Sequence, residues 1–509
     1  MAELIDIARN SQKADAHRPW PRAIVTSDAW RLVLRELVEA RATMLGLWGD
    51  RDAVHLALIE EPSGEIAVFT LECRNGKFPS VGALHPPAIR LERAIGSLYG
   101  LKPVGSPDPR PWLDLGFWGV THPLGKARKT RGGRAAYDFL PVEGEGLHQI
   151  PVGPVHAGII EPGHFRFTAN GETVVRLEQR LGYVHKGIES LMAGASIEHG
   201  ALLAGRTSGD STVAYALAFA QAIEAALQVK VPPRAIWLRA LMAELERLAN
   251  HFGDIGAICN DASFSLLYIE CGILRERTLR AAQVCFGHRL MMDRVVPGGV
   301  AEALGSEGLG AHGEASLRQL IKTVHGRFPE LIEIYDNTAS LQDRTVTTGY
   351  LAPTLARTFG AGGYIGRASG RAFDARKALA YPPYDELEFE APVRDDGDVN
   401  ARVWIRIREV EQSLKLIDQI LARLPQGQLR AKLGKPNGVR EGLGLTEGFR
   451  GDVLVSVRLD HNGAIERCHL RDPSWFQWPL LEAAIEGNIV ADFPLCNKSF
   501  NCSYSGHDL

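Results

Sequence analysis

The sequence has few cysteines for its length: seven among 509 residues, none of them in a Cys-x-x-Cys pair. An odd number without paired spacing excludes a disulfide framework and a zinc site of the Cys-x-x-Cys type. The first residues, MAELIDIARN, also lack the basic and apolar regions of a secretory signal. Because free thiols persist in a reducing compartment, we expect a cytoplasmic location.

Long hydrophobic runs and an excess of one charge are missing as well. No stretch approaches the roughly 18 apolar residues that a membrane span needs, and the longest candidate, residues 214–227, is interrupted by Gln221 and Glu224. Lys and Arg number 57 against 60 Asp and Glu, which gives a net charge of −3. This balance leaves no basic footprint for a nucleic acid. We therefore expect no nucleic-acid partner, and membrane attachment only through partner subunits.

Several motifs of stand-alone enzymes are also missing. The chain contains no Gly-x-x-x-x-Gly-Lys-Ser/Thr loop, no Gly-x-Ser-x-Gly elbow and no His-Glu-x-x-His helix. These motifs hold a nucleotide phosphate, a serine nucleophile and a catalytic zinc ion, respectively. Nothing in the sequence therefore supports a P-loop enzyme, an α/β-hydrolase or a zinc protease of these types.

Residues 1–121 mix short β-like runs with helical ones. The run 65–71, bounded by Gly64 and Asn75-Gly76, predicts a strand followed by a turn. Apolar residues recur along 88–98 with the spacing of a helix face. We interpret this part as a small α+β domain. The basic, glycine-containing segment 122–150 is interpreted as a linker, either a solvated loop or a strip that contacts an acidic partner subunit.

Residues 151–509 have a mainly helical character. In 234–251 apolar residues recur at i, i+3, i+4 and i+7, and similar patterns run through 266–289, 315–341 and 403–424. The dipeptides Asn170-Gly171 and Asn462-Gly463 each lie between β-like runs and predict hairpins. The predicted fold class is α+β: a small N-terminal α+β module followed by a mainly helical large domain with peripheral β-hairpins.

Several of these segments resemble a known superfamily. They begin at Gly153-Pro154-Val155-His156 and include EPGHFRF, NGETVVRLEQRLGYVHKGIE and VPPRAIWLRALMAELERLANHFGDIG. Together they resemble the large subunit of energy-converting, formate-hydrogenlyase-type NiFe hydrogenases and the 49 kDa-type, quinone-pocket subunit of respiratory complex I. Residues 79–115 resemble the 30 kDa-type subunit of complex I, which formate-hydrogenlyase-type large subunits carry fused ahead of the large domain. The resemblance covers about residues 50–509.

The resemblance implies a place for nickel and iron, but most of the metal ligands are missing. Active members hold the metals with two Cys-x-x-Cys pairs. The first pair corresponds here to Ser208 and Ser211, and the second to Cys502 and Ser505. A serine hydroxyl is a hard, weakly acidic ligand that cannot replace a bridging thiolate. The resemblance therefore implies a vestigial cofactor pocket at the three serines, without a NiFe centre or another metal.

Four residues near this pocket are candidate catalytic residues: Arg206, Asp210, His164 and Cys502. The tyrosine that closes the quinone pocket in complex I corresponds to Gly209, so that hydrogen-bond donor is missing. His164 either faces the pocket or is held by the backbone, and Arg206 either serves the pocket or pairs with a carboxylate. Cys502 is either a buried, unreactive thiol or a redox or metal-binding one. An open pocket would leave Asp210 with a perturbed pKa, whereas a filled one would saturate its hydrogen bonds.

Other charged residues have both functional and structural interpretations. The segment 185–189, His-Lys-Gly-Ile-Glu, is characteristic of the superfamily. The resemblance implies that this segment, with Glu189, faces an iron–sulfur small subunit; the alternative is a contact that holds a helix start inside the domain. Asp374, Arg376, Glu409 and Glu411 are interpreted as members of intramolecular ion pairs on helix faces.

The resemblance as a whole implies a large peripheral-arm subunit of a membrane-associated redox complex that couples electron transfer to ion translocation. The implied partners are an iron–sulfur small subunit, which carries the clusters, and antiporter-like and other membrane-arm subunits. The chain itself would hold no cofactor firmly, with a quinone as the candidate ligand of the pocket. It would lie on the cytoplasmic side of the inner cell membrane. Two alternatives stay open: a non-catalytic structural or coupling subunit, and an active NiFe hydrogenase large subunit.

Overall fold

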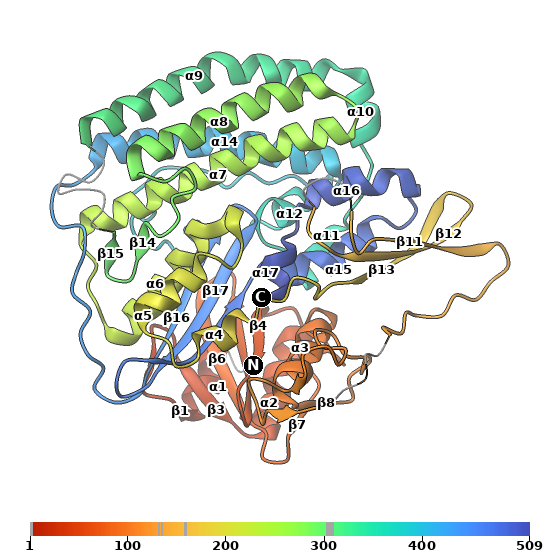
Figure 1. Cartoon of the computed structure of the whole chain (residues 1–509), viewed down its shortest axis with the longest axis vertical. Helices are drawn as coiled ribbons and strands as arrows, with labels where there is room; N and C mark the ends of the chain where they lie inside the picture. The colour runs from red at the N-terminus through yellow and green to blue at the C-terminus, as the bar shows by residue number, and fades with distance from the viewer. Residues whose placement is uncertain (1–3, 131–132, 134–135, 157–159, 302–309) are drawn as a thin grey trace.

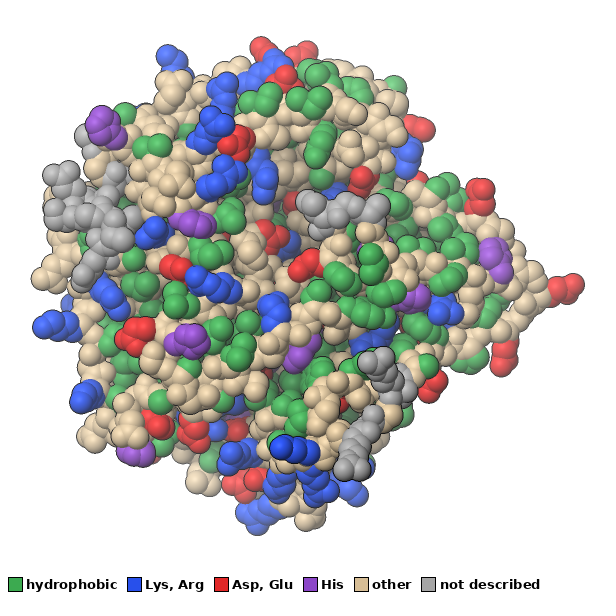
Figure 2. Space-filling view, in the orientation of Figure 1, with side chains coloured by type: hydrophobic (Ala, Val, Ile, Leu, Met, Phe, Trp, Pro, Cys, Tyr) green, Lys and Arg blue, Asp and Glu red, His purple; other side chains and the backbone are tan. Residues whose placement is uncertain are grey.

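The computed structural model describes residues 4–130, 133, 136–156, 160–301 and 310–509 (Figure 1). The fold is α+β, as predicted: a small sheet-containing N-terminal part is followed by a larger part in which long helices lie above a second sheet. Within these residues, no helix is both long and apolar enough to span a membrane. Figure 2 shows basic side chains interspersed with acidic ones over the visible face, in keeping with the balanced net charge.

The N-terminal part is built on a five-stranded sheet with the order β1-β3-β6-β5-β4. β3 and β6 pair in parallel, and the other neighbours pair antiparallel. The strand predicted at 65–71 is β6, and the helix predicted at 88–98 is α3 (Ile89–Tyr99), which ends at Gly100 with a φ of 74°. Glycine adopts this left-handed conformation without strain. The strand bounds are β1 (Gln12–Lys13), β3 (Arg22–Val25), β4 (Thr43–Gly49), β5 (Ala53–Glu60) and β6 (Glu65–Glu72).

Short elements surround this sheet and continue into the predicted linker. They are α1 (Leu4–Arg9), β2 (His17–Arg18), α2 (Ser27–Val38), β7 (Lys77–Pro79), β8 (Lys102–Val104), β9 (Val120–Thr121) and β10 (Arg128–Lys129). β10 lies within the predicted linker, and residues 131–132 and 134–135 of that linker lie outside the described residues. The domain boundaries at 121 and 150 stay a prediction.

Four long helices lie side by side at the top of Figure 1, where the sequence predicts helices. Leu238, Leu241 and Leu245 of the first helix are fully buried, as their spacing predicts. Pro233 stands in the first turn of this helix, where a missing N–H costs no hydrogen bond. Asp398 caps the last helix by accepting a hydrogen bond from the amide of Ala401 at 2.7 Å. The four are α7 (Pro233–Asp261), α8 (Ser265–Phe286), α9 (Gly310–Asn337) and α14 (Val399–Arg423).

The first predicted hairpin belongs to a three-stranded antiparallel sheet on the right of Figure 1. Its strands are β11 (Leu147–Val152), β12 (His164–Asn170) and β13 (Thr173–Arg180). The turn contains Gly171 with a φ of 57°, as an Asn-Gly turn favours. Phe165 and Phe167 pack against Phe493, with ring centroids 4.8 and 4.9 Å apart. The hairpin is thereby anchored to the C-terminal helices.

The second predicted hairpin pairs β17 (Gly451–Leu459) with β18 (Ile465–Arg471) in a sheet of order β18-β17-β16-β2. β16 (Arg440–Gly448) pairs in parallel with β2 from the N-terminal part. α6 (Thr212–Leu227) packs closely on this sheet: a Cβ at Gly442 would lie 1.8 Å from the carbonyl oxygen of Ala222. Leu454 of β17 packs in one cluster with Trp48 of the N-terminal sheet, and Val455 of β17 and Leu470 of β18 pack in another with α6. This hairpin therefore lies in the interior, which the sequence pattern did not indicate.

Shorter elements connect these layers, and three residues of the candidate site, Asp210, Ser211 and Ser505, lie in them. They are α4 (Ile188–Met192), α5 (Ile197–Ala204), β14 (Val295–Val296), β15 (Gly299–Val300), α10 (Ala339–Thr345), α11 (Pro353–Thr358), α12 (Gly363–Ala368), α13 (Ala375–Ala378), α15 (Ser474–Ala484), α16 (Phe493–Phe500) and α17 (Tyr504–Asp508), with 3-10 turns at Pro86–Ala88, Gly209–Ser211 and Val490–Asp492.

Candidate functional site

The loop that corresponds to the first metal-ligand pair is a single 3-10 turn leading directly into α6. Ser208 and Ser211 are both buried. Their hydroxyls donate hydrogen bonds to Oδ1 of Asp210, at 2.8 Å from Ser208 and 3.3 Å from Ser211. The two serine hydroxyls therefore stabilise the Asp210 carboxylate that lies between them.

Arg450, from the turn between β16 and β17, completes this network. Its Nη1 donates to Oδ1 of Asp210 at 2.8 Å and to Oγ of Ser211 at 3.1 Å, and its Nη2 donates to Oδ2 of Asp210. Its Nε donates to the carbonyl oxygen of Asn501 at 2.5 Å. All three guanidinium nitrogens are therefore engaged. Sequence reasoning missed Arg450, whose only local signal is its place before Gly451 in a tight turn.

The electrostatics of the network keep Asp210 ionised. Burial acts to raise the pKa of Asp210, but the charge of Arg450 and the hydrogen bonds from Arg450, Ser208 and Ser211 lower it to about 2. The amide of Asn250 also donates to the backbone carbonyl of Asp210 at 2.8 Å. The Asp210 side chain is still 36% exposed, because it also lines a cavity of about 170 Å³ between α7 and α8. Oδ1 accepts three hydrogen bonds and Oδ2 accepts one, so Asp210 combines the well-bonded carboxylate expected of a filled pocket with the perturbed pKa expected of an open one.

The C-terminal segment brings one serine to this network and leaves Cys502 and Ser505 with other neighbours. Oγ of Ser503 lies 2.9 Å from Oγ of Ser208. Cys502 is buried, its Sγ makes no hydrogen bond to any described residue, and burial raises the pKa of its thiol well above the usual range. Ser505 donates from Oγ to Oε2 of Glu161 at 3.0 Å. Ser503 and Glu161 are contacts that the sequence did not indicate.

The residues at the four positions that the resemblance assigns to metal ligands do not fit a NiFe centre. Three are hydroxyls, each bonded to a protein side chain, and only the fourth, Cys502, is a thiol. Such a centre requires deprotonated sulfur ligands. Within the described part of the chain, no three His, Cys, Asp or Glu side chains form a group that could hold a metal ion.

The structure places His164 and Arg206 outside this network. Nδ1 of His164 donates to the carbonyl of Gly153 at 3.2 Å, and Nε2 accepts from Nε of Arg166 at 3.3 Å. Burial lowers the pKa of His164, so its ring is neutral at pH 7. Arg206 makes a two-pronged ion pair with Asp293 at 2.6 and 2.8 Å. The contacts are those of the backbone-held histidine and the carboxylate-paired arginine, while the catalytic roles of both residues stay predictions.

Glu246 of α7 is a further buried carboxyl beside Asp210 that sequence reasoning missed. It accepts hydrogen bonds from the amides of Val213 and Ala214, at 2.7 and 3.1 Å, and so caps the N-terminus of α6. Burial raises the pKa of Glu246 to about 8; the two amides act against this shift and the charge of Asp210 adds to it. Glu246 is therefore mostly protonated at pH 7.

This shift predicts a pH dependence of stability. Between about pH 5 and 8 the folded state keeps a proton on Glu246 that the unfolded state releases, so stability falls by up to about 1.4 kcal/mol per pH unit. Glu246→Gln has no such proton, and we expect a flatter dependence and higher stability than the wild type at pH 8–9. Urea unfolding from pH 5 to 9 measures this, with the exposed Glu198→Gln as control. The same slope in wild type and Glu246→Gln would contradict the prediction.

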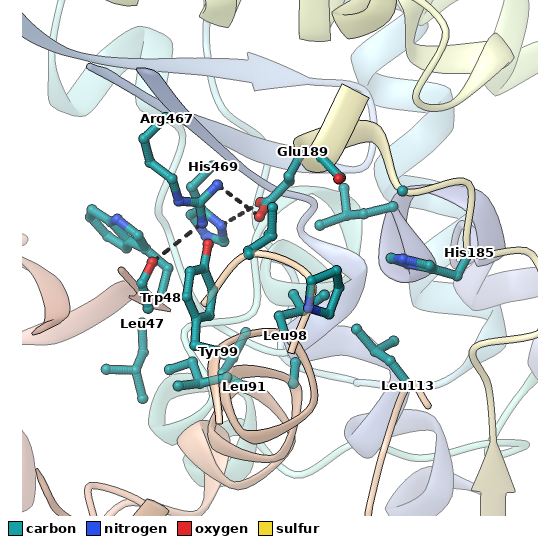
Figure 3. A pocket seen from close by; sticks show the side chains of 18 of the residues that line it. Leu47, Trp48, Leu91, Leu98, Tyr99, Leu113, His185, Glu189, Arg467 and His469 are labelled. Atoms are coloured by element: carbon teal, nitrogen blue, oxygen red, sulfur yellow. Dashed lines mark hydrogen bonds and ion pairs between the residues drawn. The ribbon is translucent and has the colours of Figure 1, made fainter. Parts of the chain in front are cut away.

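Glu189, in the segment characteristic of the superfamily, is buried inside the chain (Figure 3). It accepts a hydrogen bond from Nδ1 of His469 at 2.7 Å and pairs with Arg467 at 2.9 Å. These contacts tie the start of α4 to β18. A neighbouring cavity of about 40 Å³, lined in part by Trp48 and Tyr99, has room for a few water molecules at most. The contacts of Glu189 are those of the alternative in which it holds a helix start in place.

Glu411 pairs with Arg408 at 2.9 Å on an exposed helix face, as predicted, whereas the other predicted ion pairs are buried in the core. Arg376 pairs with Asp374 at 2.7 Å and with Glu244 at 2.9 Å. Arg367 pairs with Glu409, and all of these side chains are at most 1% exposed. These buried pairs therefore join several elements instead of lying along single helix faces, because periodicity does not show which charges tertiary packing brings together.

Comparisons with known proteins identify one matching family and several relatives. Residues 264–437 match the family described as respiratory-chain NADH dehydrogenase, 49 Kd subunit. Formate hydrogenlyase subunit 5 of Escherichia coli K12 is 31% identical over 448 residues, covering 86% of this chain and 78% of that protein. Carbon monoxide-induced hydrogenase of Rhodospirillum rubrum is 30% identical, covering 70% of this chain and 97% of that protein.

The complex I branch and a solved structure match as well. An NADH-quinone oxidoreductase subunit of Syntrophobacter fumaroxidans is 30% identical, covering 70% of this chain and 94% of that protein. A chain of the membrane-bound sulfane sulfur reductase, an archaeal respiratory membrane complex, superimposes with a TM-score of 0.67 at 25% identity. That match covers 73% of this chain and all of the other.

Proposed function

Because this chain belongs to the family of large subunits found in formate hydrogenlyase, related hydrogenases and NADH-quinone oxidoreductase, we propose that it is the large peripheral-arm subunit of a membrane-associated redox complex without a NiFe centre. The chain works together with partner subunits, as its relatives do. The complex would couple electron transfer to ion translocation.

The observation that carries this proposal is the network of Asp210 and Arg450. The carboxylate accepts from Ser208, Ser211 and Arg450, and the guanidinium has no free nitrogen. In this charge pair the carboxylate is already neutralised by Arg450, and Ser208 and Ser211 are bonded to it, so none of the three offers the thiolate that a NiFe centre needs. It favours a structural or coupling role of this pocket over a catalytic one.

Cofactors and partners follow from this role. The iron–sulfur clusters would lie in a small subunit that packs on this chain, and antiporter-like and other membrane-arm subunits would attach both to the cytoplasmic side of the inner cell membrane. The cavity beside Asp210, at about 170 Å³, is smaller than the roughly 300 Å³ of common ligand pockets. A quinone would therefore need space beyond this cavity.

Elemental analysis of the complex, purified from membranes through a tag on this chain, tests the proposal. We expect no nickel, and iron in the amount that the clusters of co-purified subunits require. Nickel in a one-to-one ratio with the chain would overturn the metal argument and make hydrogen chemistry the leading function. Purification of the chain from membranes without partners or iron would contradict its place in a redox complex.

The remaining thiol gives a second test. Cys502→Ala should leave assembly and the redox activity of the complex unchanged, because the buried, protonated thiol makes no hydrogen bond within the described residues. The cost to stability should be about 1 kcal/mol, as for other small changes in the core. Cys496→Ala, at another buried cysteine of the same region, is the control. Loss of activity in an intact Cys502→Ala complex would show that the thiol takes part in the chemistry.

A further inference from the structure

A separate cavity of about 300 Å³ lies where α6, the start of α7, β16 and the segments around Trp20 and Tyr381 meet. It is lined by Leu217, Gln221 and Ala225 on the later part of α6, whereas the Asp210 network adjoins the first turn of that helix. The two sites share no lining residue. The volume falls in the range of small-molecule pockets, about 300–1,000 Å³.

The walls of this cavity are mainly apolar and aromatic. Its larger side chains are Trp20, Leu217, Ile236, Tyr381, Tyr384 and Leu443. The hydroxyl of Tyr384 donates to Glu244 at 2.8 Å, and that of Tyr381 lies 3.1 Å from Oγ1 of Thr446. Because both hydroxyls already have partners, the two tyrosines offer the cavity their apolar rings.

The charged residues at the cavity are already neutralised. Arg239 pairs with Glu224 at 2.5 Å and also donates to the carbonyl of Gly299 at 2.9 Å. Glu224 also accepts from the amide of Gly298 at 2.7 Å. A charged ligand would find no free counter-charge here, and its desolvation would go uncompensated.

Gln221 is the polar group left without a partner. The residues of α6 from Thr212 to Ala220 are all buried. Gln221 is the first partly exposed residue of the helix, and Ala225 is the next. The amide of Gln221 makes no hydrogen bond to any described residue. A carboxamide can donate and accept at once, so it suits a hydroxyl or a carbonyl group.

We propose that this cavity is a binding site for a neutral molecule with one or two rings and a single hydroxyl or carbonyl group, held between Trp20 and the tyrosine rings and hydrogen-bonded to Gln221. The cavity size sets the number of rings, the paired Glu224 and Arg239 exclude a net charge, and Gln221 sets the polar group. The proposal does not depend on the function proposed for the Asp210 network.

Calorimetric titration of the full-length chain with 2-naphthol tests the site. We expect one saturable site with a negative heat-capacity change, as burial of apolar surface requires. The anion naphthalene-2-sulfonate should bind at least about tenfold more weakly, since its charge is left unpaired. Absence of saturable 2-naphthol binding, or equal binding of the anion, would overturn the proposal.

Three variants locate the binding. Gln221→Leu should weaken 2-naphthol binding about fivefold to tenfold, the loss of one hydrogen bond. Ala225→Phe should fill the cavity and abolish binding, whereas Ala315→Phe, on the exposed face of α9, should change nothing. Thermal melting checks that each variant is folded. If Ala225→Phe does not fold, Gln221→Leu alone tests whether 2-naphthol binds in this cavity. Wild-type affinity in folded Gln221→Leu would overturn the role of the amide.

Discussion

Glu409→Gln is expected to lower the free energy of unfolding by about 3–5 kcal/mol, because it removes one of the buried carboxylates that surround Arg367, leaving Asp374 and Glu447, and breaks the hydrogen bond from His251. Glu409 accepts from Nε of Arg367 at 3.0 Å and from Nε2 of His251 at 2.6 Å. The side-chain NH2 group of the glutamine would face one of these donors, so that two hydrogen-bond donors would point at each other. Since Arg367 and Glu409 are at most 1% exposed, water cannot replace the lost interaction.

The same helix provides the control for this variant. Glu411, two residues further along α14, pairs with Arg408 at 2.9 Å, but these side chains are 35% and 56% exposed. Glu411→Gln should therefore change the free energy of unfolding by less than about 1 kcal/mol. Urea unfolding of both variants at neutral pH measures the difference. Similar small losses in the two variants would mean that the core network does not stabilise the fold.

Acid should reduce the contribution that the Glu409 ion pairs make to the free energy of unfolding. Burial alone would raise the pKa of Glu409, but Arg367 and His251 hold it well below its usual range. A depressed folded-state pKa contributes stability that is complete above the ordinary value of about 4.5 and is lost as the pH falls below it. The difference between wild type and Glu409→Gln should therefore shrink as the pH falls below about 4.5.

Leu245→Ala is expected to lower the free energy of unfolding by about 2–5 kcal/mol, through lost burial and the cavity that remains. Leu245 is fully buried on α7, within the cluster that joins α7 to α8 and α14. Leu266→Ala on α8, where the side chain is 48% exposed, should stay within about 0.5 kcal/mol. A small change in Leu245→Ala, at an unaltered urea dependence, would mean that this face of α7 is not essential to the core.

Local patterns were sufficient for the main elements. The apolar spacing in 234–251 and 403–424 predicted α7 and α14, and the two Asn-Gly dipeptides predicted the hairpins β12–β13 and β17–β18. Apolar periodicity predicted the ends of helices less well than their presence. The segment 315–341 is divided between α9 and α10, with Thr338 between them in an extended conformation. A helix end depends on a few backbone groups and therefore leaves little trace in an apolar pattern.

The candidate site was only half accessible from the sequence. Resemblance to the family located Ser208, Ser211 and Ser505, and the chemistry of oxygen and sulfur ligands was enough to argue against a NiFe centre. It did not show that Ser505 bonds Glu161, which lies 344 positions earlier in the chain. Nor did it separate His164 and Arg206 from the network around Asp210.

By itself, the sequence determined the α+β class and the long helices, because both depend on residue identity or on spacing within one segment, whereas the loss of three thiolates stays a prediction from the resemblance. Only the tertiary structure decided that Arg450 closes on Asp210 from 240 positions away, that Glu246 is buried beside them, and that the β17–β18 hairpin lies between α6 and the N-terminal sheet. Such contacts arise when distant segments pack together, and burial then decides which charges pair and which protons are kept.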